Sequence, residues 1–360
     1  MIATLRGEGL DLVADGEGVR VRPATTGALA RAVEVLRARR IPVRVRGGGD
    51  RLGTPASGEA VLDLEQLGRI ATVDARTGIA RVEAGCRVDA LEAAARGASA
   101  TLGPLLPSVR AGSVGAWLAG PTRGERGIPG GRRETAALAV SVVLPDGRIA
   151  ESRAAPRSAT GPDLDHLALG GEGRLFIVAA AVIRLFPKAL SCRAAFRVRS
   201  LPDALEAVAR LCRDRLEPAE GIARADGDGA ILALCWEGAS SARLHRDRAL
   251  RRFEREGWTP VAEIERAGPA TAAVEVDASW ESLVRLARDV EVRAIGLVGL
   301  HAGGAYGIVD CGAERLDATE IRGPGLRILA PSSMRDAGPA WDAMGAAGPF
   351  QRLVSAWERA

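Results

Sequence analysis

The chain has 360 residues, of which 47% are hydrophobic and 26% charged, and its formal net charge is +4. These proportions are typical of globular proteins, and the length allows two domains, each with its own core. Aromatic residues make up only 3% of the chain, and its 49 basic residues are interleaved with 45 acidic ones. A surface that reads nucleic acid is therefore excluded as the main function.

The cysteines and the apolar segments narrow the class of protein further. The five cysteines lie far apart and form no C-x-x-C pair, which argues against a disulfide framework and against an iron–sulfur or zinc site in this chain. The first residues show no basic segment followed by a long apolar run, and no apolar run of about eighteen residues occurs. We therefore expect a cytoplasmic protein without a signal peptide or a membrane-spanning helix.

The first half of the chain alternates short strands with helices and glycine-rich turns. A helix capped by Thr25 or Thr26 is predicted to end before Pro42, and a strand at 43–46 follows it. Further strands are predicted at 60–64, 69–73, 79–83, 136–144 and 176–185, with a short helix at 88–96. Residues 98–135 show no sustained period, and a loop of that length is usually functional or disordered.

After Lys188 the pattern changes. Strands are predicted at 192–198, 221–225 and 230–236, with helices at 202–215 and 240–256. The order then partly repeats, with strands at 272–276, 292–300 and 305–310, a helix at 280–290, and a last helix at 349–359. This succession predicts an antiparallel sheet with helices on one face.

Three consecutive glycines follow the strand at 43–46. Because glycine has no Cβ, such a loop can turn several N–H groups toward one point and let a bulky anion approach closely. Arg46 or Arg51 can add positive charge, so the loop suits a diphosphate. By itself the loop is equally consistent with a tight turn, because glycine is the usual turn residue.

Several familiar sites are not predicted. No G-x-G-x-x-G follows the strand, and the single lysine, Lys188, follows a proline, so the sequence indicates neither a Rossmann dinucleotide site nor a P-loop. The three histidines lie far apart, which gives a metal site little support. What remains is a series of four glycine-rich or irregular segments at 47–49, 107–115, 120–124 and 170–173.

Taken in order, these segments resemble the FAD-binding domain of the vanillyl-alcohol-oxidase/p-cresol-methylhydroxylase (PCMH-type) family. The features that carry the resemblance are Arg-Gly-Gly-Gly at 46–49, V-L-D-L at 61–64, Glu-Ala-Gly at 83–85, Ser-x-Gly at 113–115, V-V-L-x-D-G at 142–147 and Gly-Glu-Gly at 171–173, before a strand that ends in Arg-Leu. Each motif is weak, but their succession over residues 20–187 is specific. Within the family the short chain, with Leu300-His-Ala-Gly-Gly-Ala305 before a strand, is similar to the FAD-binding subunit of bacterial glycolate oxidase.

The resemblance implies an α+β fold with three parts. Residues 1–188 would form a two-subdomain PCMH-type FAD-binding domain. Residues 189–330 would form a smaller cap, in which helices cover an antiparallel sheet. Residues 331–360 would form a C-terminal tail with a helix.

The resemblance also implies which residues hold the cofactor. Gly47, Gly48, Gly49 and Asp50 would cradle the FAD diphosphate; Pro107, Ser108, Ser113, Val114 and Gly115 would line the diphosphate and flavin; Glu172, Gly173 and Ile177 would contact the cofactor through their backbone. Asp50 and Arg51 stand where family members with covalent flavin carry a histidine, so the FAD is expected to be non-covalent. A simple turn is the alternative for Ser113 and Gly115.

The activity that the resemblance implies is oxidation of a small 2-hydroxy acid such as glycolate or lactate. Electrons would pass to a larger flavin subunit and an iron–sulfur subunit, in a complex that is cytoplasmic or attached to the inner membrane through those partners. His301 is the candidate base for the hydroxyl proton, although an isolated histidine is more often structural. The alternative is a non-catalytic subunit that has lost FAD, since Ala116 replaces a family glycine and the family's terminal signature is missing after Pro331.

Overall fold

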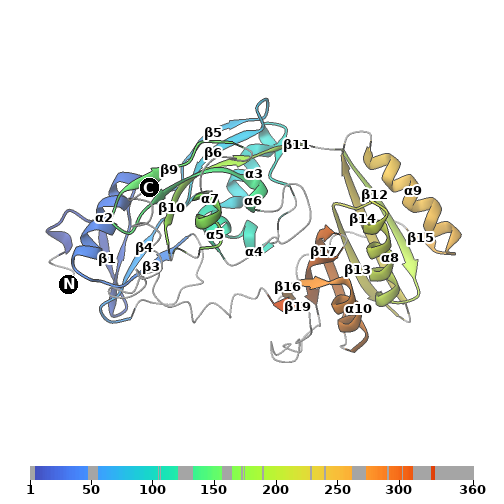
Figure 1. The fold of residues 1–360 in the computed structure, drawn as a ribbon. Helices are drawn as coiled ribbons and strands as arrows, with labels where there is room; N and C mark the ends of the chain where they lie inside the picture. Colours follow the sequence, from blue (N-terminus) through green and yellow to red (C-terminus); the bar gives the residue numbers. More distant parts are fainter. Residues whose placement is uncertain are drawn as a thin grey trace, which may run out of the picture.

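The computed structural model describes residues 5–47, 56–103, 105, 107–120, 133–155, 164–171, 173, 175–188, 190–227, 229–238, 241–261, 273–289, 292–301, 303–310 and 326–328. Within them the chain forms two bodies, each built around its own large hydrophobic core (Figure 1). One core draws its residues from Leu5 to Leu185, and the other from Phe196 to Val309. The helix predicted at 349–359 lies outside the described residues.

A four-stranded sheet begins the first body. Its strands are β1 (Leu12–Asp15), β2 (Gly18–Val21), β3 (Val43–Arg46) and β4 (Ala60–Asp63), in the order β1-β2-β4-β3. β4 pairs in parallel with both β2 and β3 and is buried along its whole length, as its apolar sequence predicts. The hairpin of β1 and β2 has no counterpart among the predicted strands.

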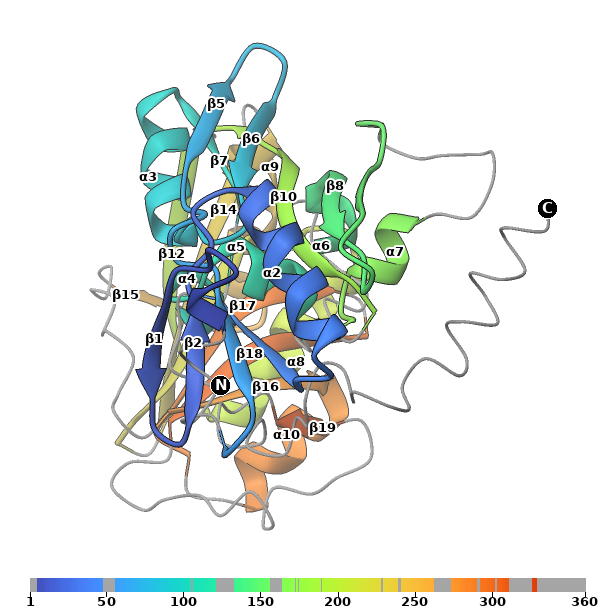
Figure 2. The ribbon, with the colours of Figure 1, turned by 90° about the vertical axis from the view of Figure 1, so that its left-hand side faces the viewer.

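Helix α2 (Thr26–Ala38) joins this sheet to a second one. The Oγ1 of Thr25 accepts the N–H of Ala28 at 3.0 Å, so Thr25 is the predicted cap. α2 packs against β8 and β10 of the second sheet (Figure 2). That sheet is antiparallel throughout and contains β5 (Ile70–Asp74), β6 (Ile79–Glu83), β10 (Ile177–Arg184), β8 (Ala137–Val143) and β9 (Ile149–Glu151), in this spatial order.

The region between the predicted helix at 88–96 and β8 contains more regular structure than its sequence indicates. After α3 (Val88–Gly97) come β7 (Ala100–Thr101), which pairs with β11 (Phe186–Pro187), and the helices α4 (Pro107–Arg110), α5 (Val114–Ala119) and α6 (Arg133–Ala136). α7 (Leu164–Ala168) follows β9. The expectation of a segment without secondary structure is wrong here, because helices of four to six residues are too short to show a period.

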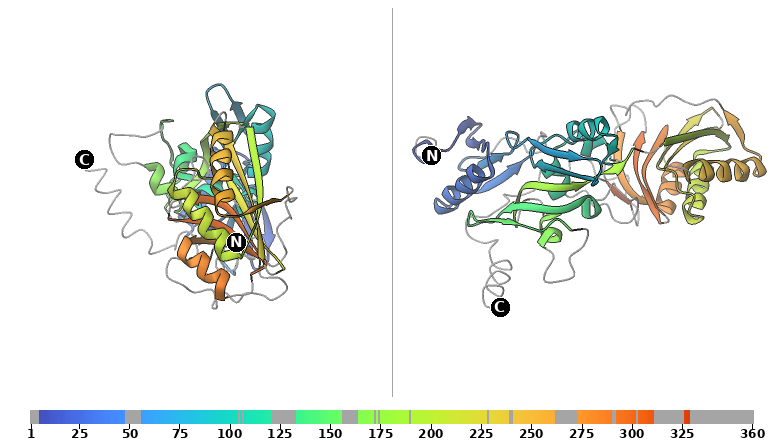
Figure 3. Two further views of the ribbon diagram at one scale, coloured as in Figure 1. Left: turned by 90° about the vertical axis from the view of Figure 1, so that its right-hand side faces the viewer. Right: turned by 90° about the horizontal axis from the view of Figure 1, so that it is seen from above.

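The second body is one eight-stranded antiparallel sheet whose helices lie along one face (Figure 3). In chain order its elements are β12 (Leu190–Val198), α8 (Leu201–Arg213), β13 (Glu220–Asp226), β14 (Gly229–Gly238), α9 (Ser241–Arg255), β15 (Thr259–Val261), β16 (Ala273–Ser279), α10 (Trp280–Asp289), β17 (Ala294–His301), β18 (Gly304–Asp310) and β19 (Leu326–Ile328). The predicted antiparallel sheet covered by helices is confirmed.

This sheet consists of two equivalent halves. Its order is β15-β12-β14-β13-β17-β18-β16-β19, so β12, β13, β14 and β15 occupy the same places in one half as β16, β17, β18 and β19 in the other. The halves meet where β13 pairs with β17. α8 and α10, the helices that follow the first strand of each half, pack against each other over the sheet.

Candidate functional site

The predicted glycine loop begins against the start of helix α5. The N–H of Leu64 donates to the carbonyl of Arg46 at 3.0 Å, so the β3–β4 pairing extends to the last residue before Gly47. A Cβ added at Gly47 would overlap the Oγ of Ser113 and lie 3.1 Å from the Cβ of Ala116. Ser113 is fully buried and caps α5, its Oγ accepting the N–H of Ala116 at 3.2 Å. Only a glycine lets the end of β3 approach this cap so closely.

The start of α5 is hydrogen-bonded to the residues that follow β6. The N–H of Val114 donates to the carbonyl of Cys86 at 2.8 Å, and the N–H of Gly115 donates to the carbonyl of Ala84 at 2.7 Å. A Cβ added at Gly115 would lie 2.9 Å from the Cβ of Ala84, so the second predicted glycine is also a position of close approach. The Glu-Ala-Gly and Ser-x-Gly motifs therefore meet in space.

Strand β10 and the segment before it also lie beside α5 and the residues that follow β6. The N–H of Ala84 donates to the carbonyl of Ala179 in β10 at 2.9 Å. The N–H of Gly170 donates to the carbonyl of Leu118, near the end of α5, at 2.9 Å. Ile177 is the first residue of β10 and is 1% exposed. Segments that are more than a hundred residues apart in the sequence thus surround α5.

A buried carboxylate stands beside the end of β3. Asp63, the last residue of β4, is 4% exposed, and its Oδ2 lies 3.8 Å from a guanidinium nitrogen of Arg46 and 3.7 Å from one of Arg20. Its Oδ1 accepts the N–H of Glu65 at 3.1 Å. Part of the positive charge of Arg46 is therefore balanced within the protein. Asp63 is not among the predicted site residues, although an acidic residue inside a buried strand signals a paired charge.

Other predicted residues are described only in part or lie outside the described residues. Gly48, Gly49, Asp50, Arg51 and Glu172 lie outside them, and so do the side chains of Pro107, Ser108 and His301. The backbones of Pro107 and Ser108 form the first half of α4, and Gly173 is buried. His301 ends β17, in the second body, and pairs with Gly304 across the β17–β18 turn.

The described part of the chain shows neither a metal-binding cluster nor a membrane-spanning helix. No group of three or more histidine, cysteine, aspartate or glutamate residues there is arranged to hold a metal ion. None of the helices described combines the length and the apolarity that crossing a membrane requires.

The family model for the FAD binding domain matches residues 18–153, a range that contains the end of β3, the end of β6 and the start of α5. Residues 18–153 therefore match an FAD-binding domain. The cofactor that the sequence predicted is thereby confirmed as FAD.

Curated relatives of the FAD-binding domain include several hydroxy-acid enzymes. The chain is 29% identical over 203 residues to the D-lactate dehydrogenase of Archaeoglobus fulgidus, which covers 55% of this chain and 45% of that protein. It is 27% identical over 172 residues to the glycolate oxidase subunit GlcD of Bacillus subtilis, which covers 47% of this chain and 37% of that subunit. The chain thus spans less than half the length of these relatives.

Solved structures share the fold over most of the chain. An alkyldihydroxyacetonephosphate synthase superposes with a TM-score of 0.70 at 15% identity, covering 94% of this chain and 74% of the other. p-Cresol methylhydroxylase superposes with a TM-score of 0.61 at 16% identity, covering 84% of this chain and 76% of the other. These likenesses confirm the predicted PCMH-type α+β fold.

The residues around α5 fit an FAD cofactor through their backbone, but not through the first backbone N–H groups of α5. Those of Val114 and Gly115 donate to protein carbonyls, and that of Ala116 donates to Ser113. The first N–H groups of α5 are therefore already bonded within the protein and are not available to a diphosphate. Gly47 and Gly115 carry no side chain that could separate these segments, which suits a site where backbone meets cofactor.

Proposed function

We propose that the chain is the FAD-binding subunit of a flavin-dependent oxidoreductase that oxidises a small 2-hydroxy acid. The observation that supports this most is that the predicted FAD motifs meet around α5 inside an FAD-binding domain. The substrate class is supported by relatives named D-lactate dehydrogenase, glycolate oxidase subunit and probable D-2-hydroxyglutarate dehydrogenase. Their names share one chemistry, a hydroxyl on the carbon next to a carboxylate.

The residues of this chain would bind FAD and handle the proton of the substrate. When bound, FAD supplies a two-electron acceptor. Gly47 to Arg51 would surround its diphosphate, while Pro107, Ser108 and the start of α5 would line the diphosphate and the flavin. Glu172, Gly173 and Ile177 would contact it through their backbone. His301, at the end of β17, would accept the hydroxyl proton of the substrate, a role that requires a neutral imidazole.

Electrons would leave through other subunits. We propose a larger flavin subunit and an iron–sulfur subunit as partners, in a complex that lies in the cytoplasm or against the inner membrane. The FAD would be non-covalent, because Asp50 and Arg51 occupy the positions at which covalent relatives have histidine. The division into a cofactor domain at 1–188, a cap at 189–330 and a tail at 331–360 is part of the same proposal.

A visible spectrum tests the proposal directly. The purified chain, alone or co-produced with its partners, should show the two visible bands of oxidised flavin, and these should bleach anaerobically with glycolate or D-lactate. His301→Gln should keep the bands but slow bleaching by about 10²–10⁴-fold, which is the usual contribution of a general base. Protein that carries no flavin even when co-produced with its partners would contradict the proposal.

A specific observation favours the alternative, a non-catalytic subunit. The first amides of α5 are already bonded within the protein, and Ala116 stands where the family has glycine. Such a subunit would assemble with its partners but bind no FAD. The flavin content of the isolated chain therefore separates the two candidates.

A further inference from the structure

Helices α8 and α10 carry the same run of residues. Glu206-Ala-Val-Ala-Arg-Leu-Cys-Arg-Asp214 in α8 and after it corresponds to Glu281-Ser-Leu-Val-Arg-Leu-Ala-Arg-Asp289 in α10, and both runs read E-x-x-x-R-L-x-R-D. The two helices are equivalent elements of the two halves of the sheet. The repeat in sequence therefore matches a repeat in structure.

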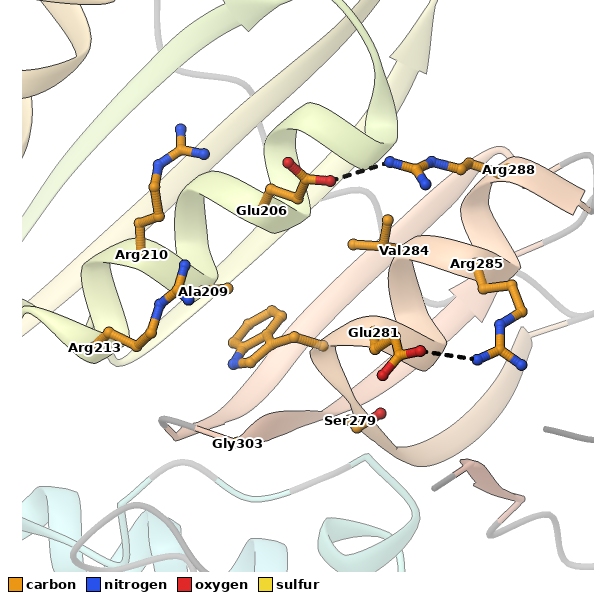
Figure 4. A pocket seen from close by; sticks show the side chains of 11 residues that line it. Glu206, Ala209, Arg210, Arg213, Ser279, Glu281, Val284, Arg285, Arg288 and Gly303 are labelled. Carbon is orange, nitrogen blue, oxygen red and sulfur yellow. Dashed lines mark hydrogen bonds and ion pairs between the residues drawn. The ribbon is translucent and has the colours of Figure 1, made fainter. Parts of the chain in front are cut away.

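The repeated residues line one groove between the helices (Figure 4). Its volume is about 700 Å³. Each helix contributes a glutamate, a small apolar residue and two arginines: Glu206, Ala209, Arg210 and Arg213 from α8, and Glu281, Val284, Arg285 and Arg288 from α10. The groove thus gathers four guanidinium groups and two carboxylates from equivalent positions.

The ion pairs in the groove do not follow its symmetry. Glu206 pairs with Arg288 across the two helices at 3.1 Å, whereas Glu281 pairs with Arg285 along its own helix at 3.3 Å (Figure 4). The symmetric counterpart of the crossing pair would join Glu281 to Arg213. In the described part of the chain no carboxylate lies within ion-pair distance of Arg213, whose side chain is exposed.

Helix stability alone does not account for this arrangement. Leu211 and Leu286 are buried in the core, which explains the repeated leucine, and Glu281 and Arg285 are spaced as a stabilising pair on one helix. Neither the burial of the leucines nor the pair along one helix requires Arg213 and Arg288 to line the same groove. The lining holds four arginines and two glutamates, and a third carboxylate, Glu256, pairs with Arg210 from outside the lining at 2.9 Å, so guanidinium groups still outnumber the carboxylates around them.

We propose that this groove docks an acidic segment of a partner protein. Guanidinium groups bind carboxylates with paired hydrogen bonds. Arg213, which has no carboxylate partner among the described residues, and the singly paired arginines beside it therefore complement a run of acidic side chains. Arg285 and Arg288 are 44% and 60% exposed, so their guanidinium groups are accessible to a peptide. The proposal does not depend on FAD or on the reaction.

A binding measurement on the full chain tests it. The probe is a fluorescein-labelled oligo-glutamate peptide, followed by fluorescence anisotropy at low ionic strength. We expect Arg213→Glu to weaken binding by about tenfold or more, because like charges would then face each other. Arg251→Glu is the matched control, since Arg251 is an exposed arginine on α9 that does not line the groove, and it should leave the affinity unchanged.

Each other result would overturn the proposal. These results are no binding of the oligo-glutamate, equal binding of an oligo-glutamine peptide, and equal weakening by Arg251→Glu. Inorganic phosphate that saturates the groove and prevents the peptide from binding would indicate a small-anion site instead. Preferential binding of duplex DNA through Arg213 would indicate a nucleic-acid surface. Far-UV circular dichroism of both variants confirms that each is folded.

Discussion

At the scale of single residues, the candidate site depends on a position that has no side chain. The end of β3 can lie against the cap of α5 only because Gly47 has no side chain, and Ser113, which it meets, is fully buried. Any added atom must displace one of these two segments, since both are held by backbone hydrogen bonds on their other sides. The predicted cofactor loop follows Gly47 in the sequence, so we expect a displacement at Gly47 to affect flavin binding.

Gly47→Ala should therefore destabilise the FAD-binding domain by about 1–3 kcal/mol, the usual effect of overpacking, and should lower the flavin content per chain. Adding Ser113→Gly should recover part of both losses, because it removes the Oγ that the new Cβ would overlap. Gly97→Ala is the control, since a Cβ there meets nothing within 4 Å. Urea unfolding and flavin absorbance measure both effects. An unchanged flavin content in Gly47→Ala would contradict the assignment of this loop to FAD binding.

Two buried thiols should be inert in the folded protein. Burial raises the pKa of Cys212 to about 12 and that of Cys86 to about 11, from an ordinary value of 9.0, with smaller contributions from nearby carboxylates. Because both thiols keep their proton when folded, iodoacetamide at about pH 8 should label them only after unfolding. Stability should fall as pH rises above about 9, where the unfolded chain begins to lose these protons. Peptide mapping by mass spectrometry reads the labelling, and rapid labelling of native Cys212 would contradict its burial.

At the scale of elements, each body has a helix whose first turn is capped by a side chain. Thr25 caps α2, and the Oγ of Ser200 accepts the N–H of Asp203 at 3.2 Å at the start of α8. Ser200→Ala should cost about 1 kcal/mol, the typical effect of losing a cap, whereas Ser200→Thr should keep most of the stability. Chemical denaturation compares the variants. A Ser200→Ala protein as stable as the original would show that this cap is not needed.

At the scale of the whole molecule, the two separate cores predict two unfolding steps. Thr25→Ala should shift only the step of the body built from residues 5–188, and Ser200→Ala only that of the sheet that begins with β12. Added FAD should raise the temperature of the first step alone, because a ligand stabilises the part that binds it. Differential scanning calorimetry resolves these steps. A single transition that both variants shift equally would argue against the proposed division near residue 188.

Much of the fold could be predicted from the sequence, because its signals are local. The cap at Thr25, the buried run of β4 and the strand–helix order after Lys188 each depend on neighbouring residues, and all are present in the structure. The order of the glycine motifs identified the FAD-binding domain, which the family comparison confirmed. Elements shorter than about two turns of helix, such as α4 and α5, were missed because they carry no period.

The contacts that define the candidate site were decided by the tertiary structure. The approach of Gly47 to Ser113, the pairing of Arg46 with Asp63 and the groove between α8 and α10 all join residues far apart in the chain. No local pattern encodes such a distance, since packing depends on how whole elements fit together. The sequence by itself thus determined the FAD-binding domain through the order of its motifs, and the fold decided which of the predicted segments meet and which of their backbone groups are already bonded within the protein.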